Sequence, residues 1–515
     1  METTSPAKIN AQLLDEKLAL LEKARAWSPR VISKFEAFLD SPDDYALFRA
    51  NPYRFAAEKG INPQEAIDLF LHANKVGLLK MEWQVLCPAC GDSIESFGAL
   101  EHVHTHYLCR LCQEECEASL DDYIQVSFTV SPQVRDISFH HPENLDVEDY
   151  YYKYHFNPIG HIGEGGPLFV DVLKQIVMGY FYLAPGESRT VEGSHDSGSY
   201  YGFDMIHNLG FMLPIQGEPV KDPQQITIRV KDDAHLTSHT HAAPGPVRFT
   251  ITNETQIRTS LMLNCMPANY KNSVLFFEPF LTGKSLFNNQ TFRNLYPNAT
   301  LGEKGGIGVK DLTLLFTDLK GSTAMYDRIG DLKAFSLVQQ HFERLTKSIQ
   351  SNQGAVVKTI GDAVMASFDK PANAVMAAAS MLKEIEEFNI EQGSTEIILK
   401  IGIHRGTSIA VTLNDRLDYF GGTVNIAARV QGLAGAEEIY LTKNVYQTPG
   451  VKELLEDFYV TPETANLKGI QKAMQVYRVT YEPPAKKAKS RKPRVKATKR
   501  KVKKTRRAKR KAARR

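Results

Sequence analysis

A carboxylate at the end of a strand is a position from which phosphate-bound metal ions can be held. The apolar run 312–316 predicts a buried strand, and Asp318 follows two residues later. A helical segment comes next, with Gly321, Ser322 and Thr323 at its start. Because the backbone N–H groups at a helix N-terminus bind phosphate, Asp318 and this turn could hold a metal ion and a phosphate together.

A second carboxylate is expected at the tip of a hairpin. Strands are predicted at 355–360 and 363–368, and Gly361-Asp362 is the turn between them. Phosphoryl chemistry of the two-metal kind uses two cations roughly 3.5–4 Å apart, held by carboxylates, to stabilise the attacking and leaving oxygens. Asp318 and Asp362 on neighbouring loops of one sheet suit that role. The alternative, that Asp362 only forms the turn, holds for most aspartates at such positions.

An amide and a guanidinium follow on one face of a helix. A helix is predicted after Gly421-Gly422, capped by Thr423, and it carries Asn425 and Arg429. The i,i+4 spacing directs these two side chains to the same side. A guanidinium there suits the negative charge that develops on a phosphate in a transition state. The ordinary alternative is a solvent-exposed pair without a role.

Together and in this order, these segments resemble the class III adenylate and guanylate cyclase family. The resemblance covers residues 308–480 and rests on the motifs FTDLKGST (316–323), VKTIGD (357–362), KIGIH (400–404) and DYFGGTVNIAAR (418–429). The family implies a ferredoxin-like α/β catalytic domain within a multidomain chain. It also implies a head-to-tail homodimer whose active sites are composed from both chains.

The resemblance further implies a role for each matching residue. Two Mg²⁺ or Mn²⁺ ions per active site would be held by Asp318, by Asp362 and by the backbone carbonyl of Leu319. Contacts to the phosphates would come from Gly321, Ser322, Thr323, Lys400 and Lys468. Asn425 would position the ribose, and Arg429 would stabilise charge at the α-phosphate.

Two further positions are those at which the family selects the purine. Lys358 can donate a hydrogen bond to a ring nitrogen, and Asp418 can accept one from the 6-amino group of adenine. Guanylate cyclases typically have Glu and Cys at these positions. The sequence therefore indicates an adenylate cyclase that converts ATP to cyclic AMP and pyrophosphate, with a guanylate cyclase as the nearest alternative.

Four cysteines in the amino-terminal half have the spacing of a zinc site. Cys87 and Cys90 form one C-x2-C pair, Cys109 and Cys112 form another, and 18 residues separate the pairs. Two such pairs supply four thiolates to a tetrahedral Zn²⁺, and a filled coordination shell indicates a structural site. Two disulfides are the alternative, which suits a reducing cytoplasm poorly.

The remaining sequence predicts further domains. The composition, 43% hydrophobic and 23% charged, is that of a globular protein, and 515 residues are too many for one core. Helical periodicity predicts a helical region at 1–80, for which a winged-helix module is a less favoured interpretation. A zinc ribbon is expected at 81–122 and a β-rich, regulatory domain at 123–300.

Some elements of these regions can be placed individually. A helix is predicted to begin at Asn62-Pro63 and to end at Gly77, because Asn and Pro favour a helix start and Gly a helix end. The apolar stretch 169–182 also has helical spacing. The segments YYYKYH (150–155) and PGESR (185–189) faintly resemble the uncharacterised domain found ahead of some bacterial cyclases.

Positive charge is concentrated at the end of the chain. Residues 485–515 hold 19 of the 62 Lys and Arg and no Asp or Glu, which leaves the rest of the chain at −16. Such a composition predicts a disordered tail that attracts nucleic acid, anionic polymers or anionic lipid. A polyanion-binding protein with a non-catalytic cyclase-like scaffold is therefore the alternative from another class. Without a long apolar run or a secretory signal, the chain is expected in the cytoplasm.

Overall fold

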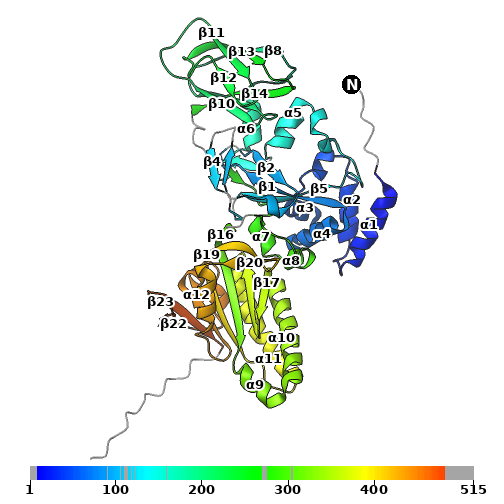
Figure 1. Ribbon diagram of the computed structural model, residues 1–515, viewed down its shortest axis with the longest axis vertical. Helices are drawn as coiled ribbons and strands as arrows, with labels where there is room; N and C mark the ends of the chain where they lie inside the picture. Colours follow the sequence, from blue (N-terminus) through cyan, green and yellow to red (C-terminus); the bar gives the residue numbers. More distant parts are fainter. Residues whose placement is uncertain are drawn as a thin grey trace, which may run out of the picture.

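The computed structural model describes residues 9–481 except positions 90, 105, 110–113, 118, 122, 158, 269–274 and 303–305. The basic tail expected at 485–515 lies outside these residues. Figure 1 shows an elongated molecule in which three parts follow one another along the long axis. A β-sandwich lies at one end, a helical part with a small sheet in the middle, and a larger α/β part at the other end.

The middle part combines four helices with a three-stranded antiparallel sheet. The helices are α1 (Ala11–Lys23), α2 (Val31–Leu39), α3 (Pro52–Lys59) and α4 (Pro63–Val76), and the strands in sheet order are β2 (Ser93–Phe97), β1 (Leu79–Leu86) and β5 (Ile124–Val130). The predicted limits of α4 agree with the structure. Asn62 Oδ1 accepts a hydrogen bond from the N–H of Gln64 at 2.9 Å, and Gly77, with a φ of 86°, follows the last turn.

Strand β5 joins regions that the sequence was expected to separate at residue 123. It pairs with β1 along its whole length, from Leu79 opposite Val130 to Val85 opposite Ile124. Every residue of β5 is buried, so both faces of the strand are covered. A strand covered on both faces belongs in the interior of a fold, which explains why it lies against β1 rather than at the start of a separate domain.

The residues after β5 continue this part and lead into the sandwich. They form α5 (Val147–Asp149), a π-helical turn (Tyr150–His155), β6 (Gly160–Ile162) and α6 (Phe169–Ile176). The helix predicted over 169–182 is therefore only partly correct. Residues Val177–Leu183 form strand β7, which pairs with a sandwich strand. This half of the stretch is rich in aromatic residues, which favour a strand.

The sandwich consists of two four-stranded sheets. One has the order β10 (Leu209–Pro214), β9 (Ser199–Asp204), β14 (Thr259–Met266), β7, and the other has the order β12 (His235–Thr237), β11 (Gln224–Val230), β13 (Gly245–Asn253), β8 (Ser188–His195). Alternate residues of β11 and β13 are buried between the sheets, as the alternating sequence predicts.

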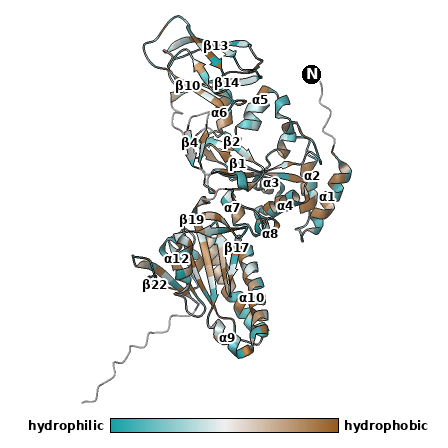
Figure 2. Cartoon of the chain, in the orientation of Figure 1, coloured by the Kyte–Doolittle hydropathy of each residue, from teal (hydrophilic) through white to brown (hydrophobic). Residues whose placement is uncertain are grey.

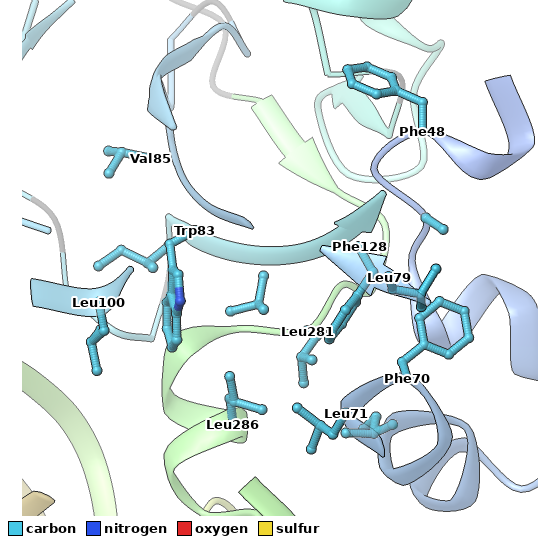
Figure 3. Close-up of a cluster of buried hydrophobic side chains, with 14 of the residues drawn as sticks. Phe48, Phe70, Leu71, Leu79, Trp83, Val85, Leu100, Phe128, Leu281 and Leu286 are labelled. Carbon is cyan, nitrogen blue, oxygen red and sulfur yellow. The ribbon is translucent and has the colours of Figure 1, made fainter. Parts of the chain in front are cut away.

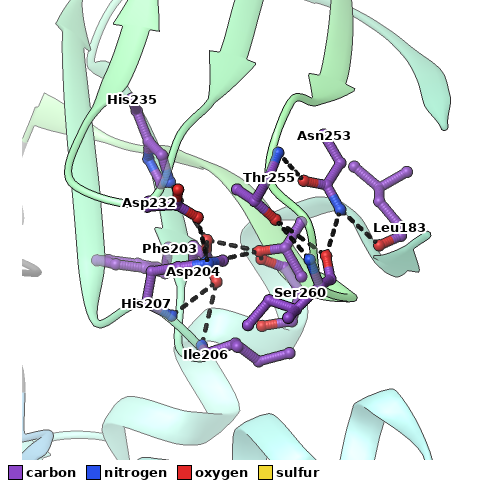
Figure 4. Close-up of polar contacts among 12 residues, drawn as sticks. Leu183, Phe203, Asp204, Ile206, His207, Asp232, His235, Asn253, Thr255 and Ser260 are labelled. Carbon is purple, nitrogen blue, oxygen red and sulfur yellow. Dashed lines mark hydrogen bonds and ion pairs between the residues drawn. The ribbon is translucent and has the colours of Figure 1, made fainter. Parts of the chain in front are cut away.

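A buried carboxylate lies at the end of strand β9 in this sandwich. Asp204 is fully buried, and its side chain accepts hydrogen bonds from Thr259 Oγ1 at 2.6 Å, from His207 Nδ1 at 2.8 Å and from the N–H of Ile206 at 3.0 Å (Figure 4). Burial by itself raises the pKa of Asp204, but hydrogen bonds from His235, Thr259 and His207 bring it below its ordinary value. The fold thus supplies the hydrogen-bond donors that a buried, ionised Asp204 requires.

The carboxyl-terminal part is an α/β structure built on one long sheet. Its strands in sheet order are β17 (Gly354–Ile360), β18 (Ala363–Phe368), β16 (Ile307–Leu319), β19 (Leu399–Leu413), β21 (Glu438–Thr442), β23 (Met474–Thr480) and β22 (Tyr459–Ala465), and β20 (Arg416–Phe420) pairs with β19. The α/β organisation expected for residues 308–480 is confirmed. Figure 2 shows apolar residues along the strands of this sheet.

The two faces of this sheet have different coverings. Leu315, Val364 and Ala366 face a core that includes apolar residues of α10 (Asp331–Ser351) and α11 (Pro371–Glu391). On the opposite face, apolar side chains including Phe316 and Met365 join the core that extends into the middle part of the molecule. The two parts therefore share one continuous hydrophobic core.

Helices α7 (Gly283–Phe287) and α8 (Gln290–Leu295) lie where the two parts meet. Leu281 and Leu286 pack with Phe128, Trp83 and other side chains of the middle part (Figure 3). From the same segment, Ser285 Oγ donates to Asp369 Oδ2 of the α/β part at 3.0 Å. This segment thus belongs to the core of one part and contacts the other.

Candidate active site

Asp318 lies at the carboxyl-terminal end of β16, as predicted. Its side chain is 31% exposed and stands directly across from Lys400 on β19. The ammonium group of Lys400 forms an ion pair with Asp318 Oδ2. A residue expected to contact phosphates is therefore a neighbour of the first metal-binding candidate, and the pair presents both charges at one end of the sheet.

Asp362 lies in the predicted turn between β17 and β18. Gly361 supplies the left-handed backbone of this turn, with a φ of 63°. Phe316 of β16 stands opposite Met365 of β18, and continuing this antiparallel register places Asp318 beside the Asp362 turn. Asp362 Oδ2 is buried and has no hydrogen-bond partner among the described residues. A buried carboxylate oxygen without a donor suits a metal ion, so these residues fit the ions that the sequence implied.

The turn after β16 has the predicted form. Gly321 has a φ of 74° and immediately precedes α9 (Ser322–Ile329). The N–H of Lys320 donates to the carbonyl of Ile398 at 2.9 Å, which fixes the turn against the start of β19. The first N–H groups of α9, including those of Ser322 and Thr323, have no partner within the helix and can receive phosphate oxygens.

Lys358 of β17 and Asp418 of β20 meet in the structure. Lys358 Nζ lies 2.5 Å from Asp418 Oδ2, and the side chains are 39% and 10% exposed. The other oxygen, Oδ1, accepts a hydrogen bond from the N–H of Tyr419 at 2.8 Å. The fold thus brings one donor and one acceptor side by side from residues that are 60 positions apart in the sequence.

Asn425 and Arg429 lie on α12 (Gly422–Gln431), Asn425 exposed and Arg429 half-buried. The Arg429 guanidinium lies against the loop that follows β22, because a Cβ added to Gly469 would be 3.4 Å from Arg429 Nη2. Lys468, whose side chain is exposed, immediately precedes Gly469 in that loop. The structure therefore brings Arg429 and the Lys468 loop together, on the helix that also presents Asn425.

Two glycines of β19 allow α12 to lie close to the sheet. A Cβ at Gly402 would be 2.1 Å from the backbone nitrogen of Gln431, and one at Gly406 would be 2.7 Å from Thr423 Oγ1. The expectation that Thr423 caps α12 is wrong, since the helix has no side-chain cap. The Thr423 hydroxyl donates instead to the carbonyl of Thr407, which ties the helix to β19.

Comparison with known proteins separates the chain into two matched segments. Residues 14–294, more than half of the chain, match a family of unknown function designated DUF5939. The chain belongs to this family. Residues 308–480 match the adenylate and guanylate cyclase catalytic domain. Both resemblances inferred from the sequence are therefore confirmed, and the α/β part is a class III cyclase domain.

The chain is similar to several cyclases over part of its length. It is 29% identical over 226 residues to an adenylate cyclase of Anabaena cylindrica, and this alignment covers 41% of this chain and 43% of that protein. It is 30% identical over 166 residues to an adenylate cyclase of Mycosarcoma maydis, covering 28% and 6% respectively. A solved adenylyl cyclase from P. aeruginosa matches 34% of this chain and 97% of its own at 23% identity, with a TM-score of 0.31. The chain spans less than half the length of the two curated relatives.

The four cysteines of the predicted zinc site lie in the DUF5939 region, and the structure describes two of them. Cys87, just after β1, and Cys109, in the strand β3 (His106–Cys109), are both buried. Cys90 and Cys112 lie outside the described residues. Strand β3 pairs with β4 (Glu114–Glu117) as a hairpin. Within the described part of the chain, no group of three or more His, Cys, Asp or Glu side chains could hold a metal ion, and no helix is long and apolar enough to cross a membrane.

Three DUF5939 residues that sequence reasoning missed contact the strands that carry Lys358 and Asp418. Arg293 Nη1 donates to the carbonyl of Leu417 at 3.0 Å. Asn288 Oδ1 accepts from the hydroxyl of Tyr419 at 3.2 Å, and Gln290 Oε1 accepts from the N–H of Val356 at 2.7 Å. These contacts hold β17 and β20 on both sides of the Lys358–Asp418 pair. The three residues lie in no motif, so the sequence offered no signal for them.

Proposed function

We propose that the protein is an adenylate cyclase that converts ATP to 3′,5′-cyclic AMP and pyrophosphate. The observation that carries this proposal is the Lys358–Asp418 pair, with 2.5 Å between Nζ and Oδ2. On binding, adenine would replace this mutual contact, because the ammonium can donate to a ring nitrogen and the carboxylate can accept from the 6-amino group. Guanine presents an oxygen where adenine presents the amino group, so Asp418 would repel it.

Asp318, Asp362 and the carbonyl of Leu319 would hold two Mg²⁺ or Mn²⁺ ions. Such ions lower the pKa of an attacking hydroxyl and neutralise phosphate charge. The unpartnered Asp362 Oδ2 supports the assignment, as does the placement of both acids at one end of the sheet. Lys400 is held beside Asp318 and would shift towards the phosphates when the carboxylate exchanges its partner.

The remaining residues of the chain would bind and orient ATP. The N–H groups of Ser322 and Thr323 would receive phosphate oxygens at the start of α9. Asn425 would fix the ribose so that its 3′-hydroxyl faces the α-phosphate. Arg429 and Lys468, from the same corner of the domain, would offset the charge that builds on the phosphates as the bond to pyrophosphate breaks.

A homodimer is part of the proposal. In one chain, the carboxylates lie at the end of β16 while Asn425 and Arg429 project from α12. Large apolar side chains are exposed next to these groups, Ile360 beside the Asp362 turn at 50% and Phe420 at the end of β20 at 65%. Exposed apolar side chains of this kind are typical of surfaces that a partner covers. Two chains placed head to tail would complete two sites.

The test is to identify the product. Purified protein incubated with Mn²⁺ or Mg²⁺ and either ATP or GTP should release cyclic AMP and pyrophosphate from ATP, with little cyclic GMP from GTP. Mass spectrometry of the nucleotide products distinguishes the outcomes. Predominant cyclic GMP would establish the guanylate cyclase alternative, and the absence of any cyclic nucleotide would favour a scaffold role.

A further inference from the structure

A cavity of about 500 Å³ lies in the DUF5939 region, far along the sequence from the cyclase motifs. Residues of α2, α3, β1 and β5 line it, together with the π-helical turn that ends at His155. Cavities of roughly 300–1,000 Å³ are typical of small-molecule sites. The volume alone does not indicate a ligand, but the side chains that form its walls do.

The inner wall carries buried amide side chains. Gln84 and Gln125 are 2% and 6% exposed, and both line the cavity. Gln84 Oε1 accepts from Ser127 Oγ at 2.8 Å, and Gln125 Oε1 accepts from Asn157 Nδ2 at 2.8 Å. The hydrogen bond to its Oε1 thus fixes the orientation of each amide group. The Nε2 of Gln125 donates to no described residue. Buried amides are costly without partners, and here they form a rigid, polar surface.

His155, which also lines the cavity, has an unsatisfied ring nitrogen. Its Nε2 is buried and has no hydrogen-bond partner among the described residues. Burial and the nearby Arg49 lower the pKa of His155 to about 3, so the ring is neutral at physiological pH. The imidazole and the Tyr150 ring form a T-shaped contact with 4.6 Å between centroids, which restricts the orientation of the imidazole. A neutral, oriented imidazole offers one hydrogen bond to a ligand.

Arg49 is a mostly buried cation of the lining, with its side chain 19% exposed. It has a left-handed backbone with a φ of 48°, a conformation that is strained for arginine and common at binding sites. Its Nη1 donates to the carbonyl of Tyr154 at 2.6 Å, but its nearest acid, Glu82, is 3.6 Å from Nε. The buried Nε has no hydrogen-bond partner among the described residues. Its Nη2 lies 3.5 Å from Ser96 Oγ, and the guanidinium lies over the rings of Phe48 and Tyr154. Because the ion pair with Glu82 includes no hydrogen bond, the guanidinium can still take a ligand anion as a hydrogen-bonded partner.

The outer wall carries more positive than negative groups. The described lining includes four cationic residues and two acidic ones, namely Arg49, Arg54, Lys59, Lys153, Asp43 and Glu58. Arg54 pairs with Glu58 at 3.0 Å and Lys153 with Asp149 at 2.6 Å, but these pairs are exposed and contribute little. Both cations can therefore exchange their partners for a ligand.

We propose that this cavity is an effector site for a small organic anion, whose carboxylate or phosphate group binds Arg49 and whose polar body binds the Gln125 and His155 side of the cavity. Carboxylate and phosphate share the chemistry that a guanidinium recognises. The buried amides and the imidazole favour an organic anion over an inorganic ion, because they offer hydrogen bonds that only a larger polar molecule can reach while it binds Arg49.

The cavity is connected to the cyclase domain through one segment. Residue 125 forms a β-bridge with residue 282, and Asn51 Nδ2, also in the lining, donates to the carbonyl of Pro279 at 2.9 Å. Thr282 Oγ1 then caps α7, accepting from the N–H of Ser285 at 3.1 Å. Helix α8 follows and contacts β17 and β20. This second step, from binding to activity, rests on the proposed function.

The first experiment measures binding alone. Thermal unfolding of the full chain is followed with citrate, inorganic phosphate or AMP at equal ionic strength, with adenosine as the uncharged counterpart of AMP. Citrate or AMP should raise the melting temperature by ~2 °C or more, and phosphate by less. Arg49→Met and Gln125→Glu should abolish the shift. Arg229→Met is the matched control, since Arg229 also has one acid at 3.6 Å but lies in the sandwich.

The outcomes separate the carboxylate and phosphate sources and can overturn the site. An equal shift in wild type and Arg49→Met would be a general salt effect and would refute it, as would equal shifts with AMP and adenosine. No shift with any of the three anions would also overturn the proposal. AMP binding is repeated in the Asp318→Ala background, where an unchanged shift that still requires Arg49 places AMP in the cavity.

The second experiment measures the effect on ATP turnover. An anion that binds should change kcat/KM for ATP about 2-fold or more in wild type and leave the Arg49→Met enzyme unaffected. Binding without any change in turnover would refute the effector role and leave the binding site. An inactive enzyme that still binds the anion would instead count against the proposed cyclase activity, so the two failures are distinguishable.

Discussion

Two carboxylates in different parts of the molecule differ in their hydrogen bonding. One, a structural acid, is surrounded by donors of the fold, and the other, an available acid, has an oxygen without a donor. Asp204 in the sandwich is fully buried, and Thr259 and His207 are among the donors that surround it. Asp362 in the cyclase domain has a buried oxygen with no donor among the described residues. A fold that leaves such an oxygen unsatisfied loses stability, which supports our proposal that a bound cation completes it.

The largest effect is expected when the available acid is changed. Asp362→Asn, or Asp318→Ala, should lower cyclase turnover by ~10³-fold or more, because each removes a proposed metal ligand. The melting temperature should stay near that of wild type, because Asp362 Oδ2 has no hydrogen bond within the described part of the chain and Asp318 loses only its part-exposed ion pair with Lys400. Turnover and thermal unfolding are measured on the same samples. Asp327→Ala, an exposed aspartate on α9, is the matched control and should keep full activity. Normal turnover in folded Asp362→Asn would refute its assignment to the metal site.

Mixing inactive variants examines whether the acids act with residues of a second chain. Asp318→Ala and Arg429→Ala should each be inactive alone. After subunit exchange, the mixture should regain about a quarter of wild-type activity, because half of randomly paired dimers are mixed and each has one complete site. Native mass spectrometry confirms the exchange. No recovery despite mixed dimers would contradict a shared site.

Exchanging the Lys358–Asp418 pair, which we propose contacts the base, should have a smaller effect. Lys358→Glu with Asp418→Cys should lower kcat/KM for ATP by ~10–100-fold, the effect expected from losing about two directed hydrogen bonds to a base. The preference for ATP over GTP should weaken in consequence. Competition assays with both nucleotides measure this ratio directly. Unchanged discrimination would mean that the pair does not contact the base.

The sequence predicted the cyclase domain far better than the DUF5939 region, for a physical reason. Asp318, Asp362 and Asn425 each lie in a short motif, and the strands and turns that hold them are local structures. The cavity wall draws Arg49, Gln84, Gln125 and His155 from separate segments, and only tertiary packing brings them together. No local pattern marks such residues.

Other misses have the same origin. The stretch 169–182 has helical spacing, yet its second half pairs with β14 because tertiary contacts prevail over a local pattern. Thr423 has the residue type of a cap but is held by a neighbouring carbonyl of β19. The ion pair of Lys400 with Asp318 followed from strand register, which the motifs alone did not give.

Contacts between the two regions should have a modest effect on catalysis. Arg293→Met removes the hydrogen bonds to the carbonyls of Leu417 and Phe287. Because these position β20 rather than touch ATP, KM should rise ~3–10-fold with a smaller change in kcat. Arg293→Lys, which keeps a donor, should recover part of the loss. Arg248→Met, an exposed arginine in the sandwich, is the control. An unchanged KM would show that the DUF5939 contact does not position β20 for substrate binding.

Replacing the structural acid should leave catalysis unchanged and weaken the fold. Asp204→Asn substitutes an amide, whose N–H groups face the donors His207 and Thr259. The melting temperature at pH 7 should fall by on the order of 5 °C, because hydrogen bonds to a buried charge are lost. Turnover per folded molecule at 25 °C should match wild type.

The stability that Asp204 contributes should depend on pH. The pKa of Asp204 is lowered from its ordinary value of 3.8, so its contribution to stability is present above that value and is lost as pH falls through the folded pKa. The difference in melting temperature between wild type and Asp204→Asn should therefore be constant near neutral pH and should shrink below about pH 4. Lost turnover with an unchanged melting temperature would contradict the prediction, because Asp204 would then contribute to catalysis and not to the stability of the sandwich.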